Sequence, residues 1–210
     1  MPASASHWLG SQLARPRGRG GWLIGQAMRI ANREPIARAI DALDLTPGDV
    51  ALDLGCGPGA GVARMARRAG RVYGIDSSSA MLDMARRANR QAIAKGTVTV
   101  AHGRFEAIPL PNASVDKLLA ANVAYFWPDF APILAEIRRV VRPGGRLAIY
   151  VTDRETMRHW RFAGPETHRQ FDAPGLRHAL LAADVPANRL AIADETLAMG
   201  VRALLCVVNL

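Results

Sequence analysis

The chain has little of several residue types, and each scarcity excludes a class of protein. Only two of its 210 residues, Cys56 and Cys206, are cysteines, too few for a disulfide framework or a zinc site, so we expect reduced thiols and no bound metal. No apolar run approaches the ~18 residues that a membrane-spanning helix needs, and the first ten residues lack the apolar core of a signal peptide. A cytoplasmic protein without a transmembrane segment is therefore predicted.

Acidic residues are absent from residues 1–33, which hold five arginines, and the whole chain has a net charge of +9. Such an arm could meet an acidic substrate, a membrane surface or a nucleic acid. A solvated terminus and an organellar transit peptide are the alternatives. The length suits one domain with a short appendage, and we predict a basic arm and helical cap over 1–44 and the main domain over 45–210.

Short apolar segments alternate with amphipathic ones from residue 50 onward. Strands are predicted at 50–54, 71–75, 97–101, 115–123, 146–151, 189–197 and 201–208, and helices at 60–69, 77–94, 129–141 and 174–183. This order predicts an α/β fold: a doubly wound, mostly parallel, seven-stranded sheet with helices on both faces. The turn at Met199-Gly200 is too short for a helical crossover, so one of the last two strands, taken as the final one, must run antiparallel.

The stretch VALDLGCGPGAG at 50–61 places four glycines in seven positions directly after the first strand. A strand, a glycine turn and a helix expose backbone amides to a ligand, and Gly55, Gly57 and Ala60 satisfy the dinucleotide pattern. No Gly-Lys-Ser/Thr follows, which excludes a nucleoside triphosphate loop. Asp76 ends the second strand, where an acid binds ribose hydroxyls; its other interpretation is an N-cap of the next helix. The two features together indicate a ligand that contains ribose, such as an adenosine.

Four blocks in order resemble the class I S-adenosylmethionine-dependent methyltransferases: VALDLGCGPG, VYGIDSSSAML, GRFEAIPLPNASVD and EIRRVVRPGGRLAI. The resemblance covers residues 45–151 well and is specific for cofactor and fold rather than for substrate. It implies S-adenosyl-L-methionine as cofactor and S-adenosyl-L-homocysteine as product. The antiparallel final strand is also typical of this family and separates it from nicotinamide-dependent dehydrogenases.

The resemblance also implies roles for individual residues. Asp76 would hold both ribose hydroxyls, Met81 would pack against the adenine, and Asp53 would orient the methionine amino group or, alternatively, bond the amides of the glycine loop. Many relatives carry an aspartate where this chain has Arg104, which cannot accept a hydrogen bond, so the adenine would rest on backbone groups near Phe105, with Glu106 as a substitute carboxylate. The implied cofactor set is Asp53, Gly55, Cys56, Gly57, Gly59, Asp76, Ser77, Met81, Arg104, Phe105 and Asn122.

The acceptor side is less well defined. The segment AANVAYFWPD lacks the Asn/Asp-Pro-Pro-Tyr/Phe pattern of enzymes that methylate DNA amino groups or protein glutamine, which argues against those substrates. No general base can be assigned, and the weak candidates are Asn122, Tyr125 and His159, with His168 weighed beside them; Asn122 could equally form a turn. The predicted acceptor contacts are Trp22, Met28, Asn32, Tyr125, Trp127 and Trp160, although the tryptophans could instead pack the arm against the domain.

The sequence thus predicts transfer of a methyl group to a small-molecule acceptor by in-line displacement. A membrane-lipid or RNA methyltransferase that uses the basic arm, or a nicotinamide-dependent oxidoreductase, is the alternative. A membrane surface is a candidate partner of the arm, whereas the lack of a recognisable RNA-binding module argues against nucleic acid.

Overall fold

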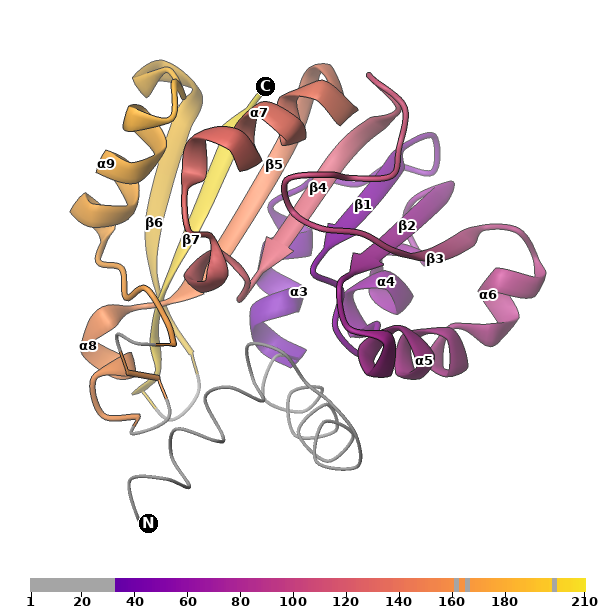
Figure 1. Ribbon diagram of the computed structural model, residues 1–210, viewed down its shortest axis with the longest axis horizontal. Coiled ribbons are helices and arrows are strands. Elements are labelled where there is room, and N and C mark those ends of the chain that lie inside the picture. Colours follow the sequence, from indigo (N-terminus) through magenta and orange to yellow (C-terminus); the bar gives the residue numbers. More distant parts are fainter. Residues whose placement is uncertain (1–32, 161–162, 165–166, 198–199) are drawn as a thin grey trace.

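The computed structural model describes residues 33–160, 163–164, 167–197 and 200–210, which form one seven-stranded sheet (Figure 1). The strand order is β3-β2-β1-β4-β5-β7-β6. The first five strands pair in parallel, and β7 runs antiparallel to both β5 and β6, which confirms the predicted fold class. The strands are β1 (Val50–Leu54), β2 (Arg71–Asp76), β3 (Val98–His102), β4 (Val115–Ala121), β5 (Val141–Thr152), β6 (Leu190–Thr196) and β7 (Arg202–Asn209).

Helices cover both faces of this sheet (Figure 1). They are α3 (Arg33–Asp41), α4 (Ala60–Met65), α5 (Ser79–Ala88), α6 (Arg90–Ala94), α7 (Phe130–Val140), α8 (Arg154–Met157) and α9 (Ala173–Ala182), with the short turns η1 (Ala124–Phe126) and η2 (Ala187–Arg189). Buried side chains of α3, α4 and α5 share one core cluster, and those of α7 and α9 share the other. The helix predicted over 77–94 is divided at Asn89. The buried side-chain amide of Asn89 donates from its Nδ2 to the backbone carbonyls of Gly59 (3.1 Å) and Ala85 (2.9 Å).

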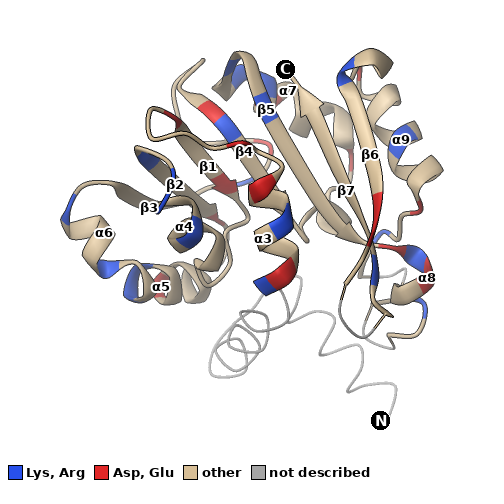
Figure 2. Cartoon of the chain, turned by 180° about the vertical axis from the view of Figure 1, so that it is seen from behind, with Lys and Arg blue, Asp and Glu red and all other residues tan. Residues whose placement is uncertain are grey.

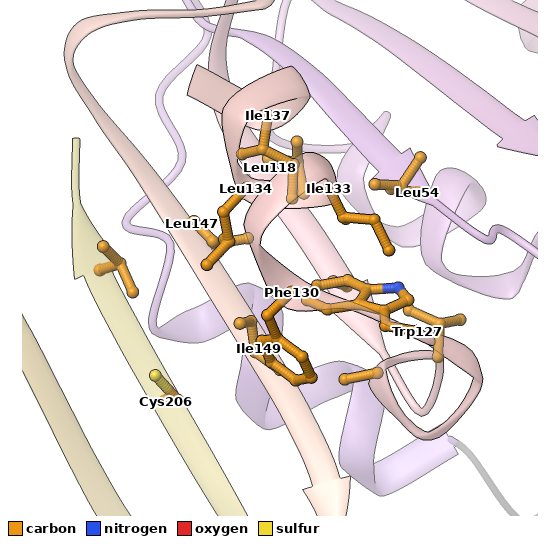
Figure 3. Close-up of a cluster of buried hydrophobic side chains, with 14 of the residues drawn as sticks. Leu54, Leu118, Trp127, Phe130, Ile133, Leu134, Ile137, Leu147, Ile149 and Cys206 are labelled. Atoms are coloured by element: carbon orange, nitrogen blue, oxygen red, sulfur yellow. The ribbon is translucent and has the colours of Figure 1, made fainter. Parts of the chain in front are cut away.

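The β5 strand shows why the sheet needs both layers. Leu147 and Ile149 belong to the cluster under α7 and α9, whereas Ala148 and Tyr150 between them belong to the cluster under α3 and α4. Such a strand is apolar on both faces, as expected for a parallel sheet covered on both sides. Figure 3 shows the first cluster, in which Trp127 and Phe130 lie near aliphatic side chains of α7 and the central strands.

The first turn of α3 contains Pro35, whose missing N–H is tolerated there because no partner within the helix exists at that position. Ala39, Ile40 and Leu43 are completely buried, so α3 and the turn after it form part of the core. None of the helices in the described ranges combines the length and the apolarity that crossing a bilayer requires.

Candidate cofactor and acceptor site

The glycine loop follows β1 at the carboxyl edge of the sheet and is bonded to the neighbouring strand. The amides of Gly55 and Cys56 both donate to the carbonyl of Ile75 at the end of β2, at 2.7 and 3.0 Å. Gly57 has φ +50°, a conformation that favours glycine, and a Cβ built there would meet no atom within 4 Å. The loop is therefore fixed on one side and presents bare backbone to open space at Gly57.

Asp76 joins this loop to the turn after β2. Its Oδ2 accepts from the amide of Gly57 at 2.9 Å, and its Oδ1 accepts from the amide of Ser78 at 2.8 Å. Burial raises the pKa of Asp76, whereas the N–H donors of Ser78, Gly57 and Ser77 lower it. The N-cap of α5 is Ser78, whose side chain accepts from Met81, so Asp76 does not fill the alternative role of helix cap. Each carboxylate oxygen keeps a further lone pair for a ligand hydroxyl.

Asp53 lies beneath the same loop and is only 4% exposed. Burial raises the pKa of its carboxyl to about 7, the charge of Asp76 adds to this, and the backbone N–H of Val62 acts in the opposite direction. A Cβ on Gly61 would lie 2.3 Å from the Asp53 Oδ2, so the carboxyl packs directly against the first turn of α4. This placement gives Asp53 a structural contact with α4. Cys56, next to it in space, is a buried thiol whose pKa is raised by that burial.

The predicted adenine side follows β3. The amide of Gly103 donates to the carbonyl of Asp76 at 3.2 Å, which places the segment after β3 beside the ribose position. Phe105 approaches the glycine loop, because a Cβ on Gly55 would lie 3.4 Å from its ring. The Arg104 side chain is exposed, with its Nε 3.5 Å from Glu106. Met81 is buried in α5, and Ser77 is exposed beside Asp76.

A polar network of the half-buried Asn122 and the buried Tyr125 lies at the end of β4, on the predicted acceptor side. Asn122 has φ 56°, and its amide donates to the carbonyl of Tyr150 at 2.7 Å. The Tyr125 hydroxyl donates to Asn122 Oδ1 at 2.8 Å and accepts the backbone N–H of Thr152. Burial raises the pKa of Tyr125 to about 12, so this hydroxyl stays protonated at neutral pH and cannot serve as a base there.

Two further predicted acceptor residues, Trp127 and Trp160, pack against the core. Trp127 was expected to face the acceptor but has no exposed surface: it packs in the core, with its ring centroid 5.0 Å from that of Phe130 (Figure 3). The reason is that the chain turns inward at η1, and the large apolar ring fills the space above α7. Trp160 is half-buried against the same core cluster. Trp22, Met28 and Asn32 lie outside the described residues.

The two histidines differ in their surroundings. His159 is exposed, and its Nε2 lies 3.4 Å from the Nε of Arg158. His168 is buried, with its ring 4.9 Å from that of Phe126 and 5.8 Å from that of Tyr125, and burial lowers its pKa to about 4. A neutral His168 therefore packs behind Tyr125 rather than carrying charge at neutral pH.

The sequence interpretation missed Thr152 and Tyr150. Thr152 donates its backbone N–H to Tyr125, a contact that no sequence pattern indicates. Tyr150 is completely buried in β5, and its backbone carbonyl accepts from the amide of Asn122. In the sequence it cannot be told from the other apolar residues of its strand. In the described part of the chain, no three His, Cys, Asp or Glu side chains are placed to hold a metal ion.

Comparison with known proteins agrees with this geometry. A methyltransferase-domain family matches residues 52–149. The uncharacterized methyltransferase YdaC of Bacillus subtilis is 34% identical over 151 residues, which cover 71% of this chain and 78% of that protein. The chain belongs to the class I S-adenosylmethionine-dependent methyltransferases.

Relatives within this methyltransferase family include a trans-aconitate 2-methyltransferase of Azoarcus, 40% identical over 133 residues that cover 61% of this chain and 49% of that protein. Several relatives are longer, and the chain spans between 29% and 49% of their length. Among solved structures, a SAM-dependent methyltransferase of Aquifex aeolicus has a TM-score of 0.64 at 20% identity, over 82% of this chain and 89% of that one. That structure shares the fold of this chain.

Proposed function

We propose that the chain transfers a methyl group from S-adenosylmethionine to a small-molecule acceptor and leaves S-adenosylhomocysteine. The observation that carries this proposal is the meeting of two features at one edge of the sheet. Open space lies at Gly57, whose amide is bonded to Asp76, and the half-buried Asn122, bonded to the buried Tyr125, follows β4, the strand next to β1. The first feature suits a nucleoside, and the second suits a polar group of an acceptor placed beside it.

The residues present fit the cofactor. The absent Cβ at Gly57 leaves room for it against the backbone, and Asp76 offers lone pairs that its two amide donors do not use. When bound, S-adenosylmethionine supplies an activated methyl group on a sulfonium. The chain has to hold the acceptor in line with that group and to exclude water.

The bond changes in this proposal are simple. A lone pair of the acceptor forms the bond to the methyl carbon, and the electrons of the broken carbon–sulfur bond stay on sulfur. A proton leaves only if the acceptor atom carries one. Tyr125 is held protonated and an amide such as Asn122 is not basic, so we assign these two side chains to orienting the acceptor rather than to removing its proton.

A small acceptor is supported by the relatives and by the site. A protein named trans-aconitate 2-methyltransferase is among the relatives, and trans-aconitate is a small polar molecule. The polar groups at the end of β4 are few, and only Asn122 among them is partly exposed, which suits one functional group better than an extended polymer.

Two alanine variants test the cofactor part of the proposal. Gly57 and Gly144 both have positive φ, +50° and +82°, and a Cβ on either would meet nothing within 4 Å. Both substitutions should therefore cost a similar free energy of unfolding, about 1–2 kcal/mol. Only Gly57→Ala places its methyl group where the cofactor is proposed, so calorimetry should show at least a tenfold weaker affinity for S-adenosylhomocysteine in that variant alone. Equal affinities in the two variants would contradict this placement.

The acceptor part is tested with methyl-labelled S-adenosylmethionine and a cell extract divided by size. We expect the label in the small-molecule fraction with the unaltered protein and with Gly144→Ala, and much less of it with Gly57→Ala. Label confined to the RNA, lipid or protein fraction would reject a small-molecule acceptor while leaving methyl transfer itself intact.

A further inference from the structure

Positive charge is concentrated in one part of the fold. Residues 60–104 hold nine of the 27 lysines and arginines but only two of the 18 acidic residues, a net charge of +7 within a chain whose total is +9. One of the two acids is Asp76, which the loop amides already bind. Outside this segment and residues 1–33, the remaining residues have a net charge of −3.

The side chains responsible lie on α4, α5, α6 and the turns that join these helices to β2 and β3 (Figure 2). We define the basic surface as the exposed residues Arg67, Arg68, Arg71, Arg86, Arg87, Arg90 and Lys95. Two of these side chains are paired: Arg68 with Asp41 at 2.6 Å and Arg86 with Asp83 at 3.2 Å. Arg67, Arg87, Arg90 and Lys95 have no acidic partner among the residues that the structure describes.

The basic surface extends between two places. The turn with Arg67 and Arg68, and Lys95, lie toward the amino edge of the sheet, whereas the end of α5 lies beside the glycine loop, because Asn89 donates to the carbonyl of Gly59 at 3.1 Å. Helices that connect parallel strands run back along the sheet, so their last residues reach the amino edge, opposite the ligand-binding edge. The turn of Arg67 and Arg68 confirms this direction, because the amide of Gly70 donates to the carbonyl of Asp49 just before β1, at 3.0 Å. Lys95 also lies toward the amino edge. Two residues after it, the backbone carbonyl of Thr97 accepts from the amide of Val72, near the start of β2, at 2.9 Å. The cations therefore extend from the amino edge of the sheet to the side of the glycine loop at Gly59.

We infer that the basic surface binds the phosphate backbone of a nucleic acid without sequence preference. Cations that are held on folded elements and have few acidic neighbours create a positive electrostatic potential, which attracts phosphate groups. Arginine also forms paired hydrogen bonds to phosphate oxygens. No large aromatic or aliphatic side chain is exposed among these cations; in the described chain the exposed large apolar residue is Leu181, on α9. Stacking on bases and insertion into a bilayer both need such side chains, which favours backbone binding over base reading and over a membrane.

The test compares two triple variants that lose the same charge. Arg67→Gln, Arg87→Gln and Arg90→Gln remove unpaired cations of the basic surface, whereas Arg177→Gln, Arg189→Gln and Arg202→Gln remove exposed arginines of α9, η2 and β7. Binding of a labelled 20-nucleotide single-stranded RNA of mixed sequence is followed by fluorescence anisotropy between 50 and 200 mM KCl. Each lost phosphate contact lowers the salt slope by about 0.7, so the first variant should lose about 2 from the slope and about 100-fold in affinity near 0.1 M salt.

The control variant should bind within twofold of the unaltered chain, and both variants keep the arginines of residues 1–33. Failure of the unaltered chain to bind RNA, or equal losses in the two variants, would overturn the inference. Binding to phosphatidylserine vesicles without binding to RNA would overturn it in favour of a membrane. Affinity for S-adenosylhomocysteine, measured on the same samples, should be equal in all three proteins and reports on the proposed function separately.

Discussion

Two carboxyl groups, Asp53 and Asp76, lie under one loop and differ in what surrounds them. Asp76 accepts two backbone N–H donors and keeps lone pairs toward the open space at Gly57. Asp53 is more deeply buried, is repelled by the charge of Asp76, and has the N–H of Val62 as its compensating donor. The same residue type is therefore free to accept from a ligand at Asp76, whereas at Asp53 its burial lowers the stability of the folded chain.

The cost at Asp53 gives a pH dependence. Its pKa is raised to about 7 in the folded chain from 3.8, so the unfolded state releases its proton first, and stability falls as pH rises from about 4 to about 7. Asp53→Asn keeps an oxygen for the N–H of Val62 but removes the charge. Urea unfolding without cofactor should show the variant gaining on the unaltered chain as pH rises, by up to about 4 kcal/mol at pH 8. A constant difference between pH 4 and pH 8 would show that Asp53 is not the titrating group.

At the scale of elements, the strands and helices could be predicted from the sequence because each has a simple local signal. The strands are short apolar runs, and the helices have amphipathic spacing. The turn at 199–200 required the antiparallel β7. The division of the helix at Asn89 could not be predicted from the sequence, because it depends on a hydrogen bond to the carbonyl of Gly59, 30 residues away in the glycine loop. The prediction for Trp127 was wrong for a similar reason. A tryptophan after a strand can lie in a pocket or in the core, and its burial here depends on packing against Phe130 of α7, which the local sequence does not show.

The hydroxyl of Tyr125 links η1 to β5, because it accepts the backbone N–H of Thr152. Tyr125→Phe leaves the buried N–H of Thr152 and the Oδ1 of Asn122 without this partner, and should lower the free energy of unfolding by about 1–3 kcal/mol. Tyr150→Phe is the matched control, because the neighbouring Tyr150 hydroxyl is buried and has no partner in the described structure. That change should be neutral or stabilising, since it removes a buried polar group that makes no bond. Denaturant titration of both variants measures the contrast, and equal losses would show that the Tyr125 bonds contribute nothing particular.

At the scale of the molecule, the two ends of the parallel strands carry different chemistry. The carboxyl edge holds the glycine loop, Asp76 and the Asn122–Tyr125 pair, whereas the amino edge beneath β2 and β3 holds exposed arginines. The cofactor edge could be predicted because its residues follow from a strand–glycine–helix order that backbone chemistry imposes. The acceptor could not be predicted, because the contacts proposed for it come from residues spread over β4, β5 and the connections, and no local pattern in the sequence indicates that these residues meet.

The proposed cofactor contacts at Gly57, Asp76 and Phe105 lie within residues 53–105, and in the described part of the chain the core begins with α3, whose Ile40 is completely buried. A chain that starts at Arg33, after an initiating methionine, should therefore still bind S-adenosylhomocysteine. Ligand at 100 times its Kd adds about 2.7 kcal/mol, which for a domain of this size raises Tm by about 5–10 °C. We expect the full chain and the shortened chain to show the same rise with S-adenosylhomocysteine and none with NAD. A rise lost only on shortening would place part of the cofactor site in residues 1–32, whereas a rise with NAD would favour the oxidoreductase alternative.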